Sequence, residues 1–162
     1  MSKTYYGDEA VAEAARYYGY KGPIDTIARH VIHDEGFVAG EYDDHKGIRT
    51  FGVGVADPEL MDKNFFTEIL PIYVDRARTA TKDFVRLPEE KQAAITSMAY
   101  RGDWGDDTKG HLAKGDLKAA AKEYLNHNEY RKGKAVDATD AQRGVSARML
   151  RNARALDPRV KP

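Results

Sequence analysis

The pattern of hydrophobic positions along this chain predicts mostly helices. One short extended region is expected over residues 37–55. Apolar side chains recur at the spacing of one helical face in residues 24–32, at Ile24, Ile27, Ala28, Val31 and Ile32. Pro23 suits the first turn of such a helix, and Glu35 would then lie at its end. Gly36 follows, and glycine is the residue that most easily takes the left-handed conformation of a helix cap.

Two short runs of extended character come next, residues 37–42 and 48–55. The polar sequence Asp43-Asp44-His45-Lys46-Gly47 between them is typical of a turn. The pattern therefore predicts a small antiparallel hairpin or meander. We expect Asp44 and Thr50 to be presented from this hairpin, with Glu35 facing them from the end of the preceding helix.

The remainder of the chain is predicted to be almost wholly helical. Proline begins three of the expected helices, at residues 57–69, 71–84 and 88–102, and the second could connect two lobes. Asp116 is the expected N-cap of a further helix, and Thr139 with Gln142 forms a capping-box pattern before the last one. The fold class is thus α+β and mostly α-helical.

Residues 1–23 read as an added element. A short helix is expected over residues 9–16, with tyrosines at positions 5, 6, 17, 18 and 20 around it. Such a helix is marginal alone, so we expect it to dock on the domain, although a tyrosine patch could instead bind sugar or a partner protein. The predicted organisation is an N-terminal helical extension, 1–23, and one domain, 24–162, with a small lobe over about 24–70 and a helical lobe over about 71–157.

Composition narrows the function classes. The 162 residues carry 26 basic and 26 acidic side chains, which argues against a dedicated nucleic-acid binder. Residues 1–70 hold 13 acidic against 7 basic side chains, whereas residues 139–162 hold 6 basic against 2 acidic. The basic last helix could favour an anionic polymer or pair with the acidic lobe. There is no cysteine, no apolar run that could cross a membrane and no recognisable signal peptide, so we expect synthesis in the cytoplasm without membrane insertion.

The candidate chemistry lies in the segment from Glu35 to Thr50. Hydrolysis of a glycosidic bond needs one protonated carboxyl group for the leaving oxygen and one ionised carboxylate for the water. Glu35 at the edge of an apolar helix and Asp44 in an open polar turn have the different environments that these roles require. Thr50 could hold a water molecule without titrating. His33 and His45 flank this segment, but the histidines show no ligand spacing typical of a metal site, so no metal is predicted.

The residues Glu35-Gly36, Tyr42, Asp44, Gly47, Thr50, Gly52 and Gly54 resemble, without a gap, the active-site signature of the phage-type lysozymes, the T-even phage lysozyme family. The resemblance implies that Glu35 is the general acid, Asp44 the base or electrostatic partner, and Thr50 the residue that positions water. It also implies a lysozyme-like fold, in which the small lobe and the helical lobe are joined by a long helix with the substrate cleft between them. One departure is Val55, where the family often has a histidine that supports the fold.

Further parts of the chain resemble the family more loosely. The helix that ends in AITSMAYRGDWG matches the family's apolar helix and glycine-rich turn, which makes Tyr100 and Trp104 candidate substrate-binding residues beside Tyr42. Trp104 could line the sugar cleft or anchor the turn. In the family an arginine near the last helix reaches the catalytic acid, and Arg143 and Arg148 are both candidates.

The function that the resemblance implies is that of a peptidoglycan hydrolase. Such an endolysin, or muramidase, cleaves the β-1,4 bond between N-acetylmuramic acid and N-acetylglucosamine without a cofactor. We expect a monomer whose partner is peptidoglycan, made in the host cytoplasm and delivered to the periplasm or cell wall by a holin or a virion. Two alternatives stay open: a lytic transglycosylase, and a non-catalytic wall-binding or virion structural module with the same fold.

Overall fold

The structure is a computed structural model that describes residues 3–44 and 46–162. The chain divides into two compact units, 1–73 and 74–162, with the boundary inside helix α3 (Leu70–Ala80). About 60% of the residues are helical, and the strands form one small antiparallel sheet, so the prediction of an α+β, mostly helical fold is confirmed. No helix in the described part of the chain is long and apolar enough to span a bilayer.

The first unit contains the sheet, whose strand order is β1-β2-β3. Strand β2 (Phe37–Asp43) and strand β3 (Arg49–Gly52) form the predicted hairpin, while β1 (Thr4–Tyr5) adds an edge strand that the sequence pattern did not predict. In the hairpin, Tyr42 pairs with Thr50 and Glu41 with Phe51, and the register shifts between Val38 and Glu41. Tyr42 and Thr50 therefore project from the same face of the hairpin.

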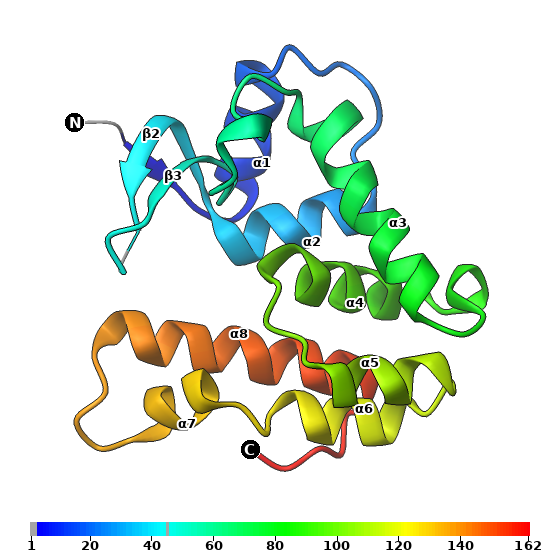
Figure 1. Cartoon of the computed structure of the whole chain (residues 1–162). Helices are drawn as coiled ribbons and strands as arrows, with labels where there is room; N and C mark the ends of the chain where they lie inside the picture. Colours follow the sequence, from blue (N-terminus) through cyan, green and yellow to red (C-terminus); the bar gives the residue numbers. More distant parts are fainter. Residues whose placement is uncertain (1–2, 45) are drawn as a thin grey trace. The chain divides into compact units, whose positions relative to one another are not determined.

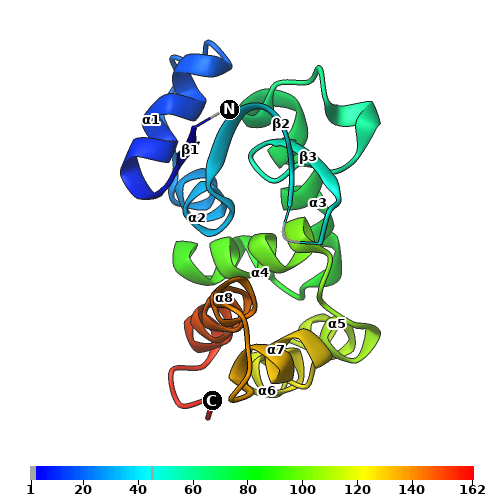
Figure 2. The same ribbon diagram turned by 90° about the vertical axis from the view of Figure 1, so that its left-hand side faces the viewer.

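Two helices pack beside this sheet. Helix α1 (Gly7–Tyr17) contacts α2 (Thr26–Glu35) and strand β2, as Figure 1 and Figure 2 show. The side of α1 that faces them is apolar and fully buried, with Ala10, Val11 and Ala14 at most 3% exposed. Helix α2 begins one turn later than Pro23 suggested, because the side chain of Asp25 accepts a hydrogen bond from Ala28 N at 2.8 Å and caps it there.

The helix predicted over residues 57–69 is wrong. The segment contains only a 3-10 turn, Pro58–Leu60, followed by a separate π-helical turn, Phe65–Ile69, that runs into α3. The side chain of Asn64 caps the second turn by accepting hydrogen bonds from Phe66 N and Thr67 N. Pro71 therefore lies inside a helix that is already under way. Because proline lacks an N–H group, it fits beside the wider turn in which Leu70 N–H donates to Phe65 O.

The second unit is built from helices. After a 3-10 turn at Phe84–Arg86 come α4 (Glu89–Arg101), α5 (Asp106–Ala113), α6 (Leu117–Tyr124), α7 (Asn128–Lys134) and α8 (Asp140–Leu156). Helix α8 contacts α4, α6 and α7 (Figure 1). Two predicted N-caps are confirmed: Asp116 accepts from Ala119 N at 3.0 Å, and Thr139 with Gln142 forms the complete capping box.

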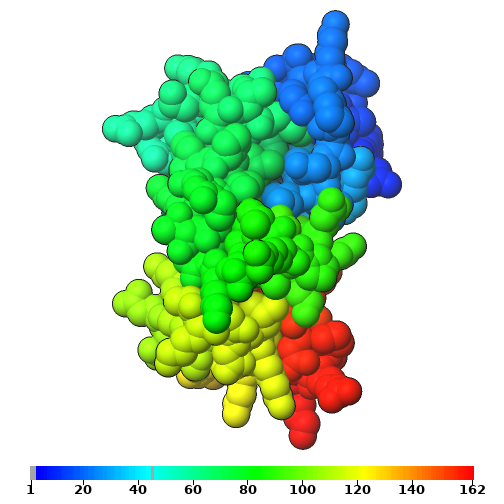
Figure 3. All heavy atoms as spheres, turned by 90° about the vertical axis from the view of Figure 1, so that its right-hand side faces the viewer, coloured from blue at the N-terminus to red at the C-terminus, as the bar shows by residue number. Residues whose placement is uncertain are grey.

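One continuous hydrophobic core holds the second unit together. Its central side chains, including Ile95, Met98, Leu112 and Met149, are fully buried. The last residues join this core, since Val160 is 9% exposed and belongs to the same cluster. In the space-filling view the red C-terminal segment accordingly lies beside the yellow segment that includes α6 (Figure 3).

Candidate active site

Glu35 is the last residue of α2, as predicted, and its side chain is half-buried. The helix ends there because Gly36 N–H donates to Ile32 O at 2.8 Å while the chain turns away. Gly36 has φ 72° and ψ −180°, so the predicted left-handed cap is wrong. This backbone conformation is essentially restricted to glycine, and it sends the chain directly from the helix into β2. A β-carbon at position 36 would also lie 3.2 Å from the carbonyl oxygen of Tyr5.

Asp44 lies at the start of the turn between β2 and β3, and its carboxylate organises that turn. Oδ1 accepts hydrogen bonds from Lys46 N and Ile48 N, both at 2.9 Å. His45, which was expected beside it, lies outside the described residues. Asp44 Oδ1 thus fixes the backbone of the turn.

Thr50 occupies the middle of the opposite strand and is only 4% exposed. Its hydroxyl donates to the carbonyl oxygen of Ile48 at 2.9 Å, which fixes the rotamer and leaves the oxygen lone pairs as acceptors. Its cross-strand partner is Tyr42. The threonine is therefore an ordered hydroxyl group in a fixed position on the hairpin.

A tight turn follows Thr50 at Gly52-Val53-Gly54. Phe51 and Val55 close it with two main-chain hydrogen bonds, Phe51 N to Val55 O at 2.8 Å and Val55 N to Phe51 O at 2.9 Å. Gly52 and Gly54 have φ +60° and +61°, which disfavour any residue with a β-carbon. Gly54 also lies directly against the candidate acid, because a β-carbon there would be 2.5 Å from Glu35 Oε2.

Tyr42 links these groups electrostatically. Its side chain is half-buried, and this burial, together with the negative charges of Glu35 and Asp44, raises the pKa of Tyr42 to about 12. A backbone hydrogen bond from Gly54 acts in the opposite direction and lowers the pKa of the phenol. Tyr42 therefore stays a neutral group within the field of both candidate carboxylates.

The arrangement can support acid–base chemistry. Glu35 at a helix end and Asp44 in a turn both act on one neutral phenol, and an ordered threonine hydroxyl lies across the strand pair from that phenol. One carboxyl group can deliver a proton, the other can accept one, and neither role needs a metal ion. The structure thus brings together four predicted site residues: Glu35, Tyr42, Asp44 and Thr50.

The other predicted residues, Tyr100, Trp104, Arg143 and Arg148, belong to the second unit. Trp104 packs against the core of that unit, with the ammonium group of Lys109 at 5.4 Å from the ring centroid, which supports its role as an anchor of the turn. Arg143 donates to Ala138 O at 2.5 Å and pairs with Asp140 at the start of its own helix. Tyr100 and Arg148 are half-buried on α4 and α8. Substrate binding by these four residues stays a prediction.

Two histidines of α2 have partners within the first unit. Nε2 of His30 lies 3.3 Å from the carboxylate of Asp34, and Nε2 of His33 lies 3.0 Å from that of Asp8. Within residues 3–44 and 46–162, no group of three or more histidine, aspartate and glutamate side chains is placed to hold a metal ion.

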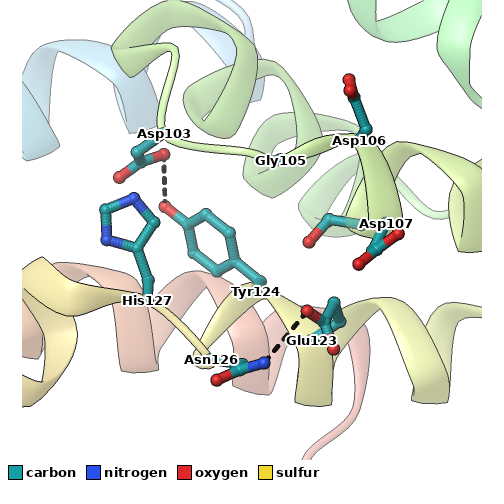
Figure 4. Close-up of a pocket in the computed structure, with 9 residues that line it drawn as sticks. Asp103, Gly105, Asp106, Asp107, Glu123, Tyr124, Asn126 and His127 are labelled. Carbon is teal, nitrogen blue, oxygen red and sulfur yellow. Dashed lines mark hydrogen bonds between the residues drawn. The ribbon is translucent and has the colours of Figure 1, made fainter.

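A separate hollow of about 350 Å³ lies in the second unit between α5 and the end of α6 (Figure 4). Its lining includes Asp103, whose carboxylate accepts from Tyr124 Oη at 2.8 Å and pairs with Arg101 at 3.0 Å. Figure 4 also shows the hydrogen bond between Asn126 and Glu123 on its rim. None of the predicted site residues lines this hollow, and its best-buried carboxylate is already engaged in holding the loop before α5 onto α6.

The fold of the whole chain is the lysozyme-like fold of phage endolysins. The crystal structure of the active form of P1 phage endolysin Lyz superposes with a TM-score of 0.53 over 91% of this chain and 93% of that chain, at 14% sequence identity. Identity at this level establishes similarity of fold alone. Comparison with protein-family models and with curated protein sequences finds no match.

Sequence reasoning missed one residue of the site environment, Tyr18. Its ring belongs to the N-terminal element, yet its phenol oxygen reaches the glycine turn after Thr50. The tyrosine cluster around residues 5–20 was the available signal, but composition alone does not reveal which of five tyrosines contacts a distant hairpin.

Proposed function

We propose that this protein is a peptidoglycan hydrolase of the lysozyme type, which cleaves the β-1,4 bond between N-acetylmuramic acid and N-acetylglucosamine. The observation that carries the proposal is the shared environment of Tyr42, on which the charges of both Glu35 and Asp44 act, opposite Thr50 on the neighbouring strand. The endolysin-like fold supports it independently. Fold similarity alone would not assign the reaction, because one fold hosts several functions.

In this mechanism Glu35 donates its proton to the glycosidic oxygen as the bond to the anomeric carbon breaks. A water molecule held by Thr50 attacks that carbon from the other side, and Asp44 accepts its proton or stabilises the positive charge that develops on the sugar. The products are a new reducing end and a free hydroxyl group, so one water molecule is consumed for each bond cleaved. Tyr42, neutral beside both carboxylates, would contact the sugar.

The setting follows from the same proposal. The substrate of such an enzyme is the cell wall, so we propose that the protein acts on peptidoglycan in the periplasm or at the wall as a monomer, after delivery by a holin or a virion. Delivery by a holin would fit a role in phage release, and delivery on a virion would fit a role in wall penetration.

The test compares wild type with Glu35→Gln on Gram-negative cells whose outer membrane has been permeabilised. We expect wild type to clear the suspension and Glu35→Gln to lose about 10²- to 10⁴-fold of the rate, because the amide has no proton of suitable acidity to donate. Glu41→Gln is the matched control, since Glu41 lies in the same hairpin but pairs with Arg49 in solvent. It should clear the cells as wild type does.

Mass spectrometry of the released fragments identifies the reaction. Hydrolysis gives reducing muropeptides, whereas a lytic transglycosylase gives anhydro sugars that are one water lighter. Substantial activity in Glu35→Gln would remove Glu35 from the mechanism. A folded wild type that sediments with the wall without clearing it would favour the binding-module alternative.

A further inference from the structure

Tyr18, immediately after α1, is fixed from two sides within the first unit. Its carbonyl oxygen accepts a hydrogen bond from Asn64 Nδ2 at 2.9 Å, and Asn64 in turn caps the helical turn that begins at Phe65. The ring packs edge-on against Phe37 and Phe66, with centroids 6.3 Å and 6.2 Å away. A tyrosine held by its main chain and by neighbouring rings has little freedom to move.

The free end of this side chain reaches the glycine turn of the candidate active site. Tyr18 Oη lies against the α-carbon of Gly52 and occupies the space that a β-carbon would need. Gly52 is therefore required twice, once for its φ of +60° and once for this close approach. Two residues before it is Thr50, and two residues after it is Gly54, against which the Glu35 carboxylate lies.

The phenol of Tyr18 is neutral, which fits a role in positioning the turn rather than a role in proton transfer. Burial, together with smaller contributions from the neighbouring phenols of Tyr17 and Tyr42, raises the pKa of Tyr18 to about 12. Tyr18 is thus uncharged wherever a carboxyl group can act as the acid. Its contribution to the site is a fixed oxygen atom that defines where Gly52 can lie.

We propose that Tyr18 is a positioning residue of the active site, whose phenol oxygen packs on Gly52 and sets the turn that joins Thr50 to Gly54. The inference rests on the proposed hydrolase function and extends it to the N-terminal element. Residues 1–23 then contribute to catalysis through geometry, without contact with the substrate. A displacement of about 1 Å in such a turn is enough to lower a catalytic rate substantially.

The first measurement is the steady-state rate of Tyr18→Phe on soluble, uncross-linked glycan strands, well below the temperature at which the variant unfolds. Removing one oxygen leaves the ring and its aromatic contacts in place but opens a gap beside Gly52. We expect kcat to fall about 3- to 10-fold while KM changes less than about twofold, because the turn positions the water and the acid rather than the sugar. Loss of fold would instead lower the amount of active enzyme, which urea unfolding of the same samples reports.

The second measurement is a double-mutant cycle with Gly52→Ala. In the wild-type background the new β-carbon collides with Tyr18 Oη, whereas in the Tyr18→Phe background its nearest ring atom, Cζ, is at an ordinary 3.6 Å. We expect Gly52→Ala to lower kcat about 100-fold in the wild-type background. In the Tyr18→Phe background we expect the same substitution to lower kcat only about tenfold. Gly7→Ala is the matched control, since Gly7 has the same φ of +60° with no atom within 4 Å of its β-carbon. Its effect should be the same in both backgrounds.

The outcomes separate the two proposals. An active wild type with non-additive loss at position 52 and additive loss at position 7 supports the positioning role. An active wild type with unchanged kcat in Tyr18→Phe, or with additive loss at position 52, overturns it and leaves the hydrolase intact. A folded wild type that cleaves no glycan overturns the hydrolase and the positioning role together.

Discussion

The contact between Gly54 and Glu35 allows the geometry of the candidate active site to be perturbed without changing any charged group. A β-carbon on Gly54 would lie 2.5 Å from Oε2, 3.1 Å from Cδ and 3.3 Å from Cβ of Glu35. Non-bonded carbon and oxygen atoms prefer separations of roughly 3.5 Å or more, so in Gly54→Ala the carboxylate has to move by about 1 Å. The φ of +61° adds backbone strain of about 1–2 kcal/mol.

These two effects predict different losses in stability and in rate. We expect Gly54→Ala to unfold with a free energy lower by about 1–3 kcal/mol, which a protein of ordinary stability tolerates. A misplacement of about 1 Å in a catalytic group can cost about 100-fold in rate, so kcat on soluble glycan strands should fall by that order.

The measurement is kcat beside urea unfolding, with Gly7→Ala as the control for strain. Gly7 shares the left-handed φ but has open space around its β-carbon, so its substitution should destabilise the protein by the strain alone and leave kcat unchanged. A folded Gly54→Ala enzyme with a rate within about threefold of wild type would show that the position of Glu35 against this turn does not matter to catalysis.

Three further predictions address the base, the packing of the second unit and the alkaline limit of stability. Asp44→Asn keeps the Oδ1 acceptor that orders the turn and removes only the charge, so it should lose about 100-fold in rate while the exposed Asp43→Asn loses almost none. Gly133→Ala should lower the unfolding free energy by about 2 kcal/mol or more, because its β-carbon would overlap with α8, whereas Gly144→Ala, with open space, should raise it by about 0.5–1 kcal/mol. The pKa of Tyr42 rises from 10.0 to about 12 on folding, so the stabilisation that the neutral phenol contributes is complete below pH 10 and disappears as the pH rises towards 12. Urea unfolding between these pH values should therefore show a steeper fall of the unfolding free energy for wild type than for Tyr42→Phe.

Local signals in the sequence predicted much of the fold. Helix ends marked by a side chain that bonds to the neighbouring backbone, such as Asp116 and Thr139, fall where the pattern placed them, because an N-cap needs only residues within one turn of itself. The same holds for the end of α2 at Glu35 and for the hairpin that follows. Four candidate site residues, Glu35, Tyr42, Asp44 and Thr50, could be selected from the sequence because they lie in one short segment whose spacing is fixed by a helix end and a turn.

Features that depend on distant contacts could not be predicted. Strand β1 has only two residues, and its pairing with β2 is set by the docking of α1 rather than by any local pattern. The π-helical turn before α3 depends on Asn64, whose side chain binds both the helix start and the carbonyl of Tyr18. The contact between Tyr18 and Gly52 joins the residue after α1 to the last residue of β3, with α2 and β2 between them in the chain. Propensity and periodicity carry no information about such pairs.

Val55 follows the second glycine of the turn, at the position where the phage lysozymes often have a histidine that supports the fold. The valine is 4% exposed, and its main chain closes the turn with both hydrogen bonds to Phe51. Burial of an aliphatic side chain of this size contributes about 1.5–3 kcal/mol, comparable with or larger than the net gain of a typical side-chain hydrogen bond. The turn that presents Gly54 to Glu35 is therefore held by main-chain bonds, by apolar packing and by Tyr18. Because these supports are uncharged, the proton transfers that we propose for Glu35 and Asp44 would take place without a charge change in the structure that positions the two carboxyl groups.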